Sequence, residues 1–170
     1  LHRGEPAIHN GADDNASGTA ALIELARMIK KDKSKKANYL FIAFSGEELG
    51  LFGSKYFTEH PSIPLASVNY MINMDMVGRL NDSSKTLQIG GYGTSPWWGQ
   101  LFGKMSNKKY FTIKYDSSGT GPSDHTSFYR KDIPVLFFFT GLHSDYHKPT
   151  DDFDKINYTG ELMLIKYIYN

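Results

Sequence analysis

Apolar residues in this chain gather in short uniform runs, separated by segments with a helical spacing. The runs at residues 39–44, 68–74 and 134–139 are uniformly apolar or nearly so, as is typical of strands buried on both faces. Residues 111–115 alternate between apolar and polar, which predicts a strand with one exposed side. A further short strand is predicted at Leu87 to Ile89, which is followed by two glycines.

Helices are predicted between these strands. Leu22, Leu25, Ala26 and Ile29 recur at the spacing of one helix face. Further helical segments are expected at about residues 51–59, at residues 96–106, in a short stretch after residue 123, and from about residue 158 to the end. Alternating helices and buried strands predict an α/β fold with a mainly parallel, mixed sheet flanked by helices, in one domain covering residues 1–170.

Composition narrows the classes of partner. The chain has 170 residues, of which 40% are hydrophobic and 22% charged, and its net charge is +1. Nothing in this balance indicates a nucleic-acid partner or an acidic membrane surface. The absence of cysteine excludes disulfides and cysteine-based zinc sites. The apolar run at residues 135–139, like the one at 39–44, is too short to span a bilayer.

Two adjacent carboxylates, Glu47 and Glu48, follow the apolar run at 39–44. Ser45 and Gly46 end the predicted strand, so the two acids emerge at its C-terminal end, where open α/β sheets bind ligands. Neighbouring side chains in an extended loop diverge, so one acid could hold a metal while the other faces a water molecule. Alternatively, both acids occupy the first turn of the next helix, where negative charge suits the helix dipole.

Other metal-ligand types are predicted at the same edge of the sheet. Asp14 lies in a glycine-flanked loop that enters a helix, Asp75 closes the strand at 68–74, and His147 lies in the loop after the strand at 134–139. Carboxylates and an imidazole that converge without a cation would repel or remain unpaired. Zinc accepts such a mixture of oxygen and nitrogen ligands, and an aspartate shared by two ions makes a two-metal hydrolytic site.

A series of motifs carries a family resemblance. In order they read Asp-Asp-Asn-Ala-Ser-Gly, Ser-Gly-Glu-Glu-Leu-Gly, Asn-Met-Asp-Met, Ser-Asp-His and Tyr-His-Lys-Pro-Thr-Asp, between about His9 and Asp152. This order resembles metallopeptidase family twenty-eight, which comprises zinc aminopeptidases such as bacterial leucyl aminopeptidases, with glutaminyl cyclases and carboxypeptidase-like proteins as relatives. The resemblance implies a zinc-exopeptidase architecture, a peptide substrate with a free N-terminus, and a secreted or periplasmic location.

The resemblance also implies a role for each metal ligand. Asp14, directly before Asn15-Ala16-Ser17-Gly18, corresponds to the carboxylate that bridges two zinc ions. Glu48 and His147 correspond to the other ligands of one zinc, and Asp75 to a ligand of its neighbour.

Two further roles, and one feature of the backbone, follow from the same resemblance. Glu47 corresponds to the general base, which must not itself be tied to the metal. Tyr146 resembles a phenol that in some members donates a hydrogen bond to the tetrahedral oxyanion. The peptide bond between Asp14 and Asn15 is expected to be cis.

One family motif is missing. The first zinc ligand of the family is the histidine of a His-x-Asp motif upstream of the bridging aspartate, and neither His2 nor His9 stands in such a motif. We therefore expect the chain to correspond to the C-terminal two-thirds of a catalytic domain. It should hold one zinc firmly, bind the second poorly, and have impaired activity.

Three functions are compatible with these residues: an aminopeptidase, a glutaminyl cyclase, and a catalytically inactive binding domain. A cyclase needs one zinc, for which Asp14, Glu48 and His147 would suffice, but cyclases of the family carry tryptophan where this chain has Tyr146. Loss of Glu47 or Glu48 would favour the binding domain, and both are present.

A serine-hydrolase interpretation of Ser123-Asp124-His125 is also conceivable, but the chain has no Gly-x-Ser-x-Gly nucleophile elbow. We predict that Asp124 caps the following helix and that His125 packs beneath the site. His60 and His143 are predicted to be loop or surface residues.

Overall fold

The structure is a computed structural model, and it describes residues 6–34, 37–105 and 110–170. Its sheet has the strand order β1-β4-β2-β3. The strands are β1 (Met71–Met74), β2 (Thr86–Gly90), β3 (Thr112–Tyr115) and β4 (Val135–Phe139). β1 runs parallel to β4 and β2 parallel to β3, whereas β2 and β4 are antiparallel. The predicted α/β class with a mainly parallel, mixed sheet is confirmed.

The pairing of β1 with β4 places two loops at one edge of the sheet. Met74, the last residue of β1, is paired with Phe138 near the end of β4. Because the two strands are parallel, the chain leaves both of them on the same side. Asp75 and the long loop after β4 therefore start close together.

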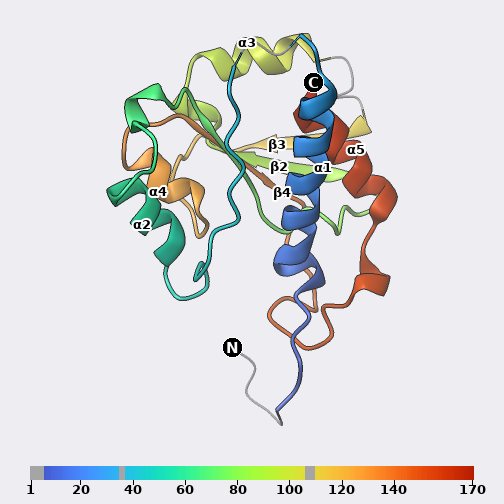
Figure 1. Cartoon of the computed structure of the whole chain (residues 1–170). Coiled ribbons are helices and arrows are strands. Elements are labelled where there is room, and N and C mark those ends of the chain that lie inside the picture. Colours follow the sequence, from blue (N-terminus) through green and yellow to red (C-terminus); the bar gives the residue numbers. More distant parts are fainter. Residues whose placement is uncertain (1–5, 35–36, 106–109) are drawn as a thin grey trace.

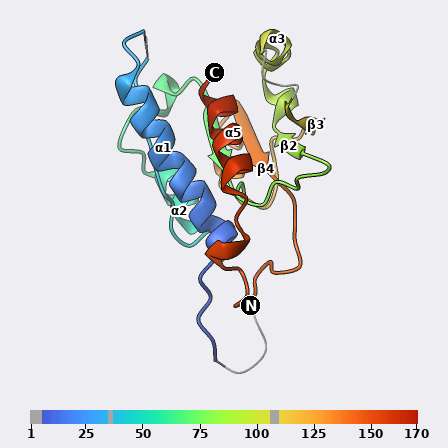
Figure 2. The same ribbon diagram turned by 90° about the vertical axis from the view of Figure 1, so that its right-hand side faces the viewer.

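Helices cover both faces of the sheet. Figure 1 shows α1 (Gly18–Lys31) and α5 (Tyr158–Tyr169) side by side, with α2 (Phe52–Glu59) and α4 (His125–Tyr129) on the other side of the sheet. The rotated view in Figure 2 shows α1 and α5 together in front of the strands, and α3 (Trp97–Lys104) at one end of the molecule. Short helical turns connect these elements at Leu65–Ser67, Tyr92–Thr94 and Phe153–Lys155.

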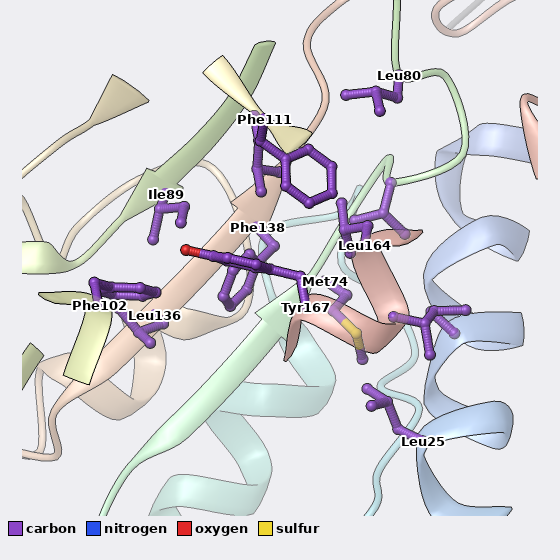
Figure 3. Close-up of a cluster of buried hydrophobic side chains, with 14 of the residues drawn as sticks. Leu25, Met74, Leu80, Ile89, Phe102, Phe111, Leu136, Phe138, Leu164 and Tyr167 are labelled. Carbon is purple, nitrogen blue, oxygen red and sulfur yellow. The ribbon is translucent and has the colours of Figure 1, made fainter. Parts of the chain in front are cut away.

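The alternation of side chains along β4 divides the core between the two faces. Leu136 and Phe138 belong to the larger cluster beneath α1 and α5, whereas Val135 packs with Phe128 of α4 on the other face. Tyr167 of α5 lies at the centre of the larger cluster among Phe102, Phe111 and Phe138 (Figure 3). A strand that is covered on both faces needs apolar residues at successive positions, which explains the uniform run in β4.

The N-terminus of α5 is defined by its cap. Asn157 Oδ1 accepts a hydrogen bond from the backbone N–H of Gly160, at 2.9 Å, and thereby satisfies one of the free donors in the first turn. The helix begins at Tyr158, as predicted. The predicted helix at 96–106 is α3, but its last residue, Ser106, lies outside the described residues, as does His2.

The predicted buried strand at residues 39–44 is wrong. This segment is extended but forms no strand within the described residues, and Tyr39, Leu40 and Phe41 are exposed. A strand forms only where a neighbouring backbone completes its hydrogen bonds, and no described strand pairs with this segment. Only its last apolar residue, Phe44, packs well, with ring centroids 6.0 Å from Phe57 and 5.9 Å from Phe128.

Within the described part of the chain, no helix has both the length and the apolar character needed to cross a membrane.

Candidate metal centre

Three of the predicted metal ligands meet in space, although they come from distant parts of the sequence. Asp14 lies in the irregular turn Ala12–Ser17 that leads into α1, Glu48 in the loop before α2, and His147 in the loop after β4. One potential ligand atom from each of the three residues can be chosen so that all lie within 4.8 Å of one another. Two carboxylates and an imidazole at this separation could bind one ion.

The imidazole lies between the two carboxylates. His147 Nε2 is 3.2 Å from Asp14 Oδ2 and 3.1 Å from Glu48 Oε1. The side chain of Asp14 is 13% exposed and that of Glu48 54% exposed, so the cluster opens to solvent on the side of Glu48. One ring nitrogen thus faces two carboxylate oxygens. A cation bound by all three atoms would fit the same arrangement.

The backbone around Asp14 is held against the end of β1. The Asp14–Asn15 peptide bond is cis, as the resemblance implied. The side chain of Asn15 donates to Met74 O at 3.0 Å and accepts from the N–H groups of Gly18 and Met76. Gly18 has no room for a side chain, because a Cβ atom there would lie 2.4 Å from Met74 O. These contacts fix the start of α1 beside the C-terminal end of β1.

Asp75 lies beside the three-residue cluster rather than in it. Its Oδ2 accepts a hydrogen bond from Ser123 Oγ at 2.7 Å, and its buried Oδ1 has no hydrogen-bond partner among the described residues. The negative charge of Asp75 nevertheless acts on the neighbouring acids. It contributes to the raised pKa values of both Asp14 and Glu47. A buried carboxylate oxygen without a partner is the kind of group that a cation could satisfy.

The carboxylates at this edge of the sheet disfavour one another's ionised forms. Burial, followed by the charges of Glu48 and Asp75, raises the pKa of Asp14 to about 7. Burial also raises the pKa of Glu47 to about 7, with further contributions from Asp75, Glu48, Asp124 and Asp14. A divalent cation would replace this mutual repulsion with attraction, so the donor set fits zinc.

Tyr146 adjoins the cluster. Its ring stacks on that of His147, with the centroids 3.7 Å apart and the planes inclined at 26°. Burial, together with the charges of Asp14, Glu48, Asp75 and Glu47, raises the pKa of its phenol, which therefore remains a hydrogen-bond donor at neutral pH.

The Ser-Asp-His motif has the structural role that was predicted for its histidine. His125 is buried and stacks on Phe137, with ring centroids 4.5 Å apart, and burial lowers the pKa of its imidazole to about 4. The predicted capping role of Asp124 is wrong, because its side chain makes no capping bond to α4. The side chain of Asp124 is instead buried, and its charge contributes to the raised pKa values of Glu47 and Asp75.

The sequence analysis did not identify a second layer of residues behind Asp14. The fully buried Asp13 accepts hydrogen bonds from Gly78 N and Ser17 Oγ, and its Oδ2 lies 3.2 Å from His143 Nε2. The prediction that His143 is a loop or surface residue is therefore only half right, since its ring is largely buried against Asp13. The spacing of apolar residues around Asp13 and Asp14 does not indicate which of the two side chains is fully buried.

Comparison with known proteins agrees with this geometry. The profile described as Peptidase family M28 matches residues 2–169. Aminopeptidase YwaD of Bacillus subtilis is 33% identical over an alignment of 162 residues that covers 86% of this chain and 34% of that protein. The chain thus spans about a third of the length of this relative.

Solved structures share the fold. A zinc aminopeptidase from Bacillus subtilis superposes with a TM-score of 0.81 at 29% identity, covering 95% of this chain and 41% of that one. A glutaminyl cyclase from Porphyromonas gingivalis has a TM-score of 0.71 over 95% of this chain and 62% of its own, but at 18% identity this likeness shows the fold alone. The profile spans nearly the whole chain and the motif residues gather at one edge of the sheet, so this protein is a member of peptidase family M28.

Proposed function

We propose that this chain carries the catalytic centre of a zinc-dependent aminopeptidase, which hydrolyses the N-terminal bond of a peptide. One observation supports this most. Potential ligand atoms of Asp14, Glu48 and His147 lie within 4.8 Å of one another, and Glu47 directly precedes Glu48 in the sequence. Family membership and the names of the relatives point in the same direction.

In this proposal Asp14, Glu48 and His147 hold one zinc ion. The three residues offer oxygen and nitrogen donors of the types that zinc takes in catalytic sites, where three protein ligands leave one position open. When bound, zinc lowers the pKa of a coordinated water to about 7 and polarises a carbonyl group. The side chain of Glu48 is 54% exposed, and the peptide is proposed to approach the zinc from this side.

Glu47 is proposed as the general base. It is adjacent to a ligand but does not belong to the three-residue cluster, so its carboxylate is free to accept a proton. A pKa of about 7 is close to the value at which a base is most effective near neutral pH. Tyr146 is proposed to donate a hydrogen bond to the oxyanion of the substrate, since its phenol remains protonated beside these acids.

A second zinc would be held less firmly. Asp14 and Asp75 are the residues that we propose for that position, and Asp75 lies outside the three-residue cluster. We therefore propose one firmly bound zinc, a weak second one, and weak peptidase activity for these 170 residues.

Glutaminyl cyclase is the alternative. A set of three ligands around one ion is what a single-zinc cyclase needs, and a cyclase is among the solved structures with this fold. The presence of Tyr146 in place of tryptophan favours the aminopeptidase.

Parallel assays on the zinc-loaded chain distinguish the two activities. We expect slow release of p-nitroaniline from an amino-acid p-nitroanilide, abolished by Glu47→Gln, and no cyclisation of a peptide that begins with glutamine. Cyclisation without p-nitroaniline release would instead support the cyclase. Zinc binding with neither activity would support a binding domain.

A further inference from the structure

One buried carboxylate connects the segments that carry Asp14 and His147. Asp151 Oδ2 accepts hydrogen bonds from the backbone N–H groups of both Asp13 and Asp14, each at 3.0 Å. The backbone carbonyl of Asp151 also accepts from Ala12 N at 3.1 Å. Asp151 is 2% exposed, so water does not compete for these bonds. Three successive N–H groups of the turn around Asp14 are therefore held by one residue.

The same residue ends a short turn that begins at Lys148, directly after His147. The N–H of Asp151 donates to the carbonyl of Lys148, the residue after His147, at 3.1 Å. His147 itself has a left-handed backbone conformation, with φ of 56°. The turn thus has a defined shape, and its far end is attached to Asp14, which is 137 positions from Asp151 in the sequence.

We propose that Asp151 is a positioning residue for the metal centre, which sets the distance between the carboxylate of Asp14 and the ring of His147. This inference rests on the proposed zinc site. Asp151 acts through the backbone of Asp14, since it offers its carboxylate to two N–H groups and not to the cluster. Zinc–ligand bonds vary little in length, so a small displacement of Asp14 relative to His147 would weaken metal binding.

The neighbouring residue provides a matched control. Asp152 has the same side chain, but its carboxylate accepts from the side chain of Asn10, at 2.6 Å, and not from the backbone around Asp14. If any acid in this turn served equally well, the two positions would respond alike.

Zinc affinity of the folded chain, measured with a competing chelator, tests the proposal. Asp151→Ala should lower the affinity by about 10–100-fold, the loss typical when a partner that orients a ligand is removed. Asp151→Asn retains one oxygen that can accept both N–H bonds, and should restore most of the affinity. Asp152→Ala should remain within about threefold of the wild type, as expected for a residue that does not orient a ligand.

A second control separates positioning from general stability. Leu164→Ala removes a fully buried side chain of the core and should lower the melting temperature without lowering zinc affinity in the folded state. Asp151→Ala that binds zinc as tightly as the wild type would overturn the positioning role and leave the proposed function intact. The role would also be overturned if Asp151→Asn, folded and as stable as the wild type, lost zinc affinity. A wild-type chain that binds no zinc would overturn both proposals.

Discussion

His147 Nε2 lies 3.1 Å from Glu48 Oε1, although 99 positions of sequence separate the two residues. Asp14 Oδ2 lies 3.2 Å from the same nitrogen. The imidazole lies between two carboxylates, so removal of the ring would leave the three-residue cluster with only two potential metal ligands. We therefore expect His147→Ala to lower zinc affinity at least about 100-fold, because even the loss of a ligand's outer partner costs about 10–100-fold.

His60 is the matched control for this prediction. It is an exposed histidine that stacks on Tyr56, with ring centroids 4.6 Å apart, and it is not part of the donor cluster. Titration of the metal-free chain with Zn²⁺ should show one tight site in the wild type and in His60→Ala. Equal affinity in His147→Ala would show that the histidine is not a ligand.

Glu47→Gln should separate metal binding from catalysis. The substitution keeps the size of the side chain but removes its capacity to accept a proton at neutral pH. We expect zinc affinity to remain within about threefold, whereas peptidase turnover falls by about 100- to 10,000-fold, the usual contribution of a general base. Single-turnover assays and zinc titration of the same preparation would show this. A parallel loss of both properties would indicate that Glu47 is itself a ligand.

Much of the fold follows from periodicity alone. The spacing of Leu22, Leu25 and Ile29 predicts α1, and the uniform run in β4 predicts a strand covered on both faces. The approach of Asp14 to His147 was expected from motif order and parallel strands, and needed no knowledge of side-chain contacts.

The contribution of Asp13 could not be predicted in this way. Its importance depends on which backbone N–H group it faces, and this is set by the path of the chain after β1 rather than by spacing. The segment at residues 39–44 fails for a related reason. An apolar run shows that a strand is possible, but pairing depends on a partner elsewhere in the sequence.

The wrong strand prediction at residues 39–44 suggests a comparison of two further variants. Phe44 packs between Phe57 and Phe128, whereas Leu40 is 55% exposed. Phe44→Ala should lower the free energy of unfolding by about 2–4 kcal/mol, because it empties an aromatic cluster. Leu40→Ala should change it by less than about 0.5 kcal/mol. Urea unfolding of both variants measures the difference, and a loss of more than 2 kcal/mol in Leu40→Ala would restore the buried-strand interpretation.

The last prediction concerns pH and a buried acid away from the metal ligands. Glu161, in the first turn of α5, is 6% exposed, and burial raises the pKa of its carboxyl to about 7, with a smaller contribution from the charge of Asp13. The folded state therefore binds this proton more tightly than the unfolded state. Its contribution to stability is fully present below about pH 4.5, the ordinary value, and is lost as the pH rises towards 7.

Glu161→Gln should remove this dependence, because glutamine stays neutral. With metal chelated, the variant should match the wild type near pH 4.5 and exceed its free energy of unfolding by about 2–3 kcal/mol at pH 8. Glu59→Gln, at the exposed end of α2, is the control and should follow the wild type throughout. Urea unfolding between pH 4.5 and 8 provides the comparison. A wild type and Glu161→Gln with parallel pH profiles would show that Glu161 is ionised in the folded chain, its charge balanced by a partner.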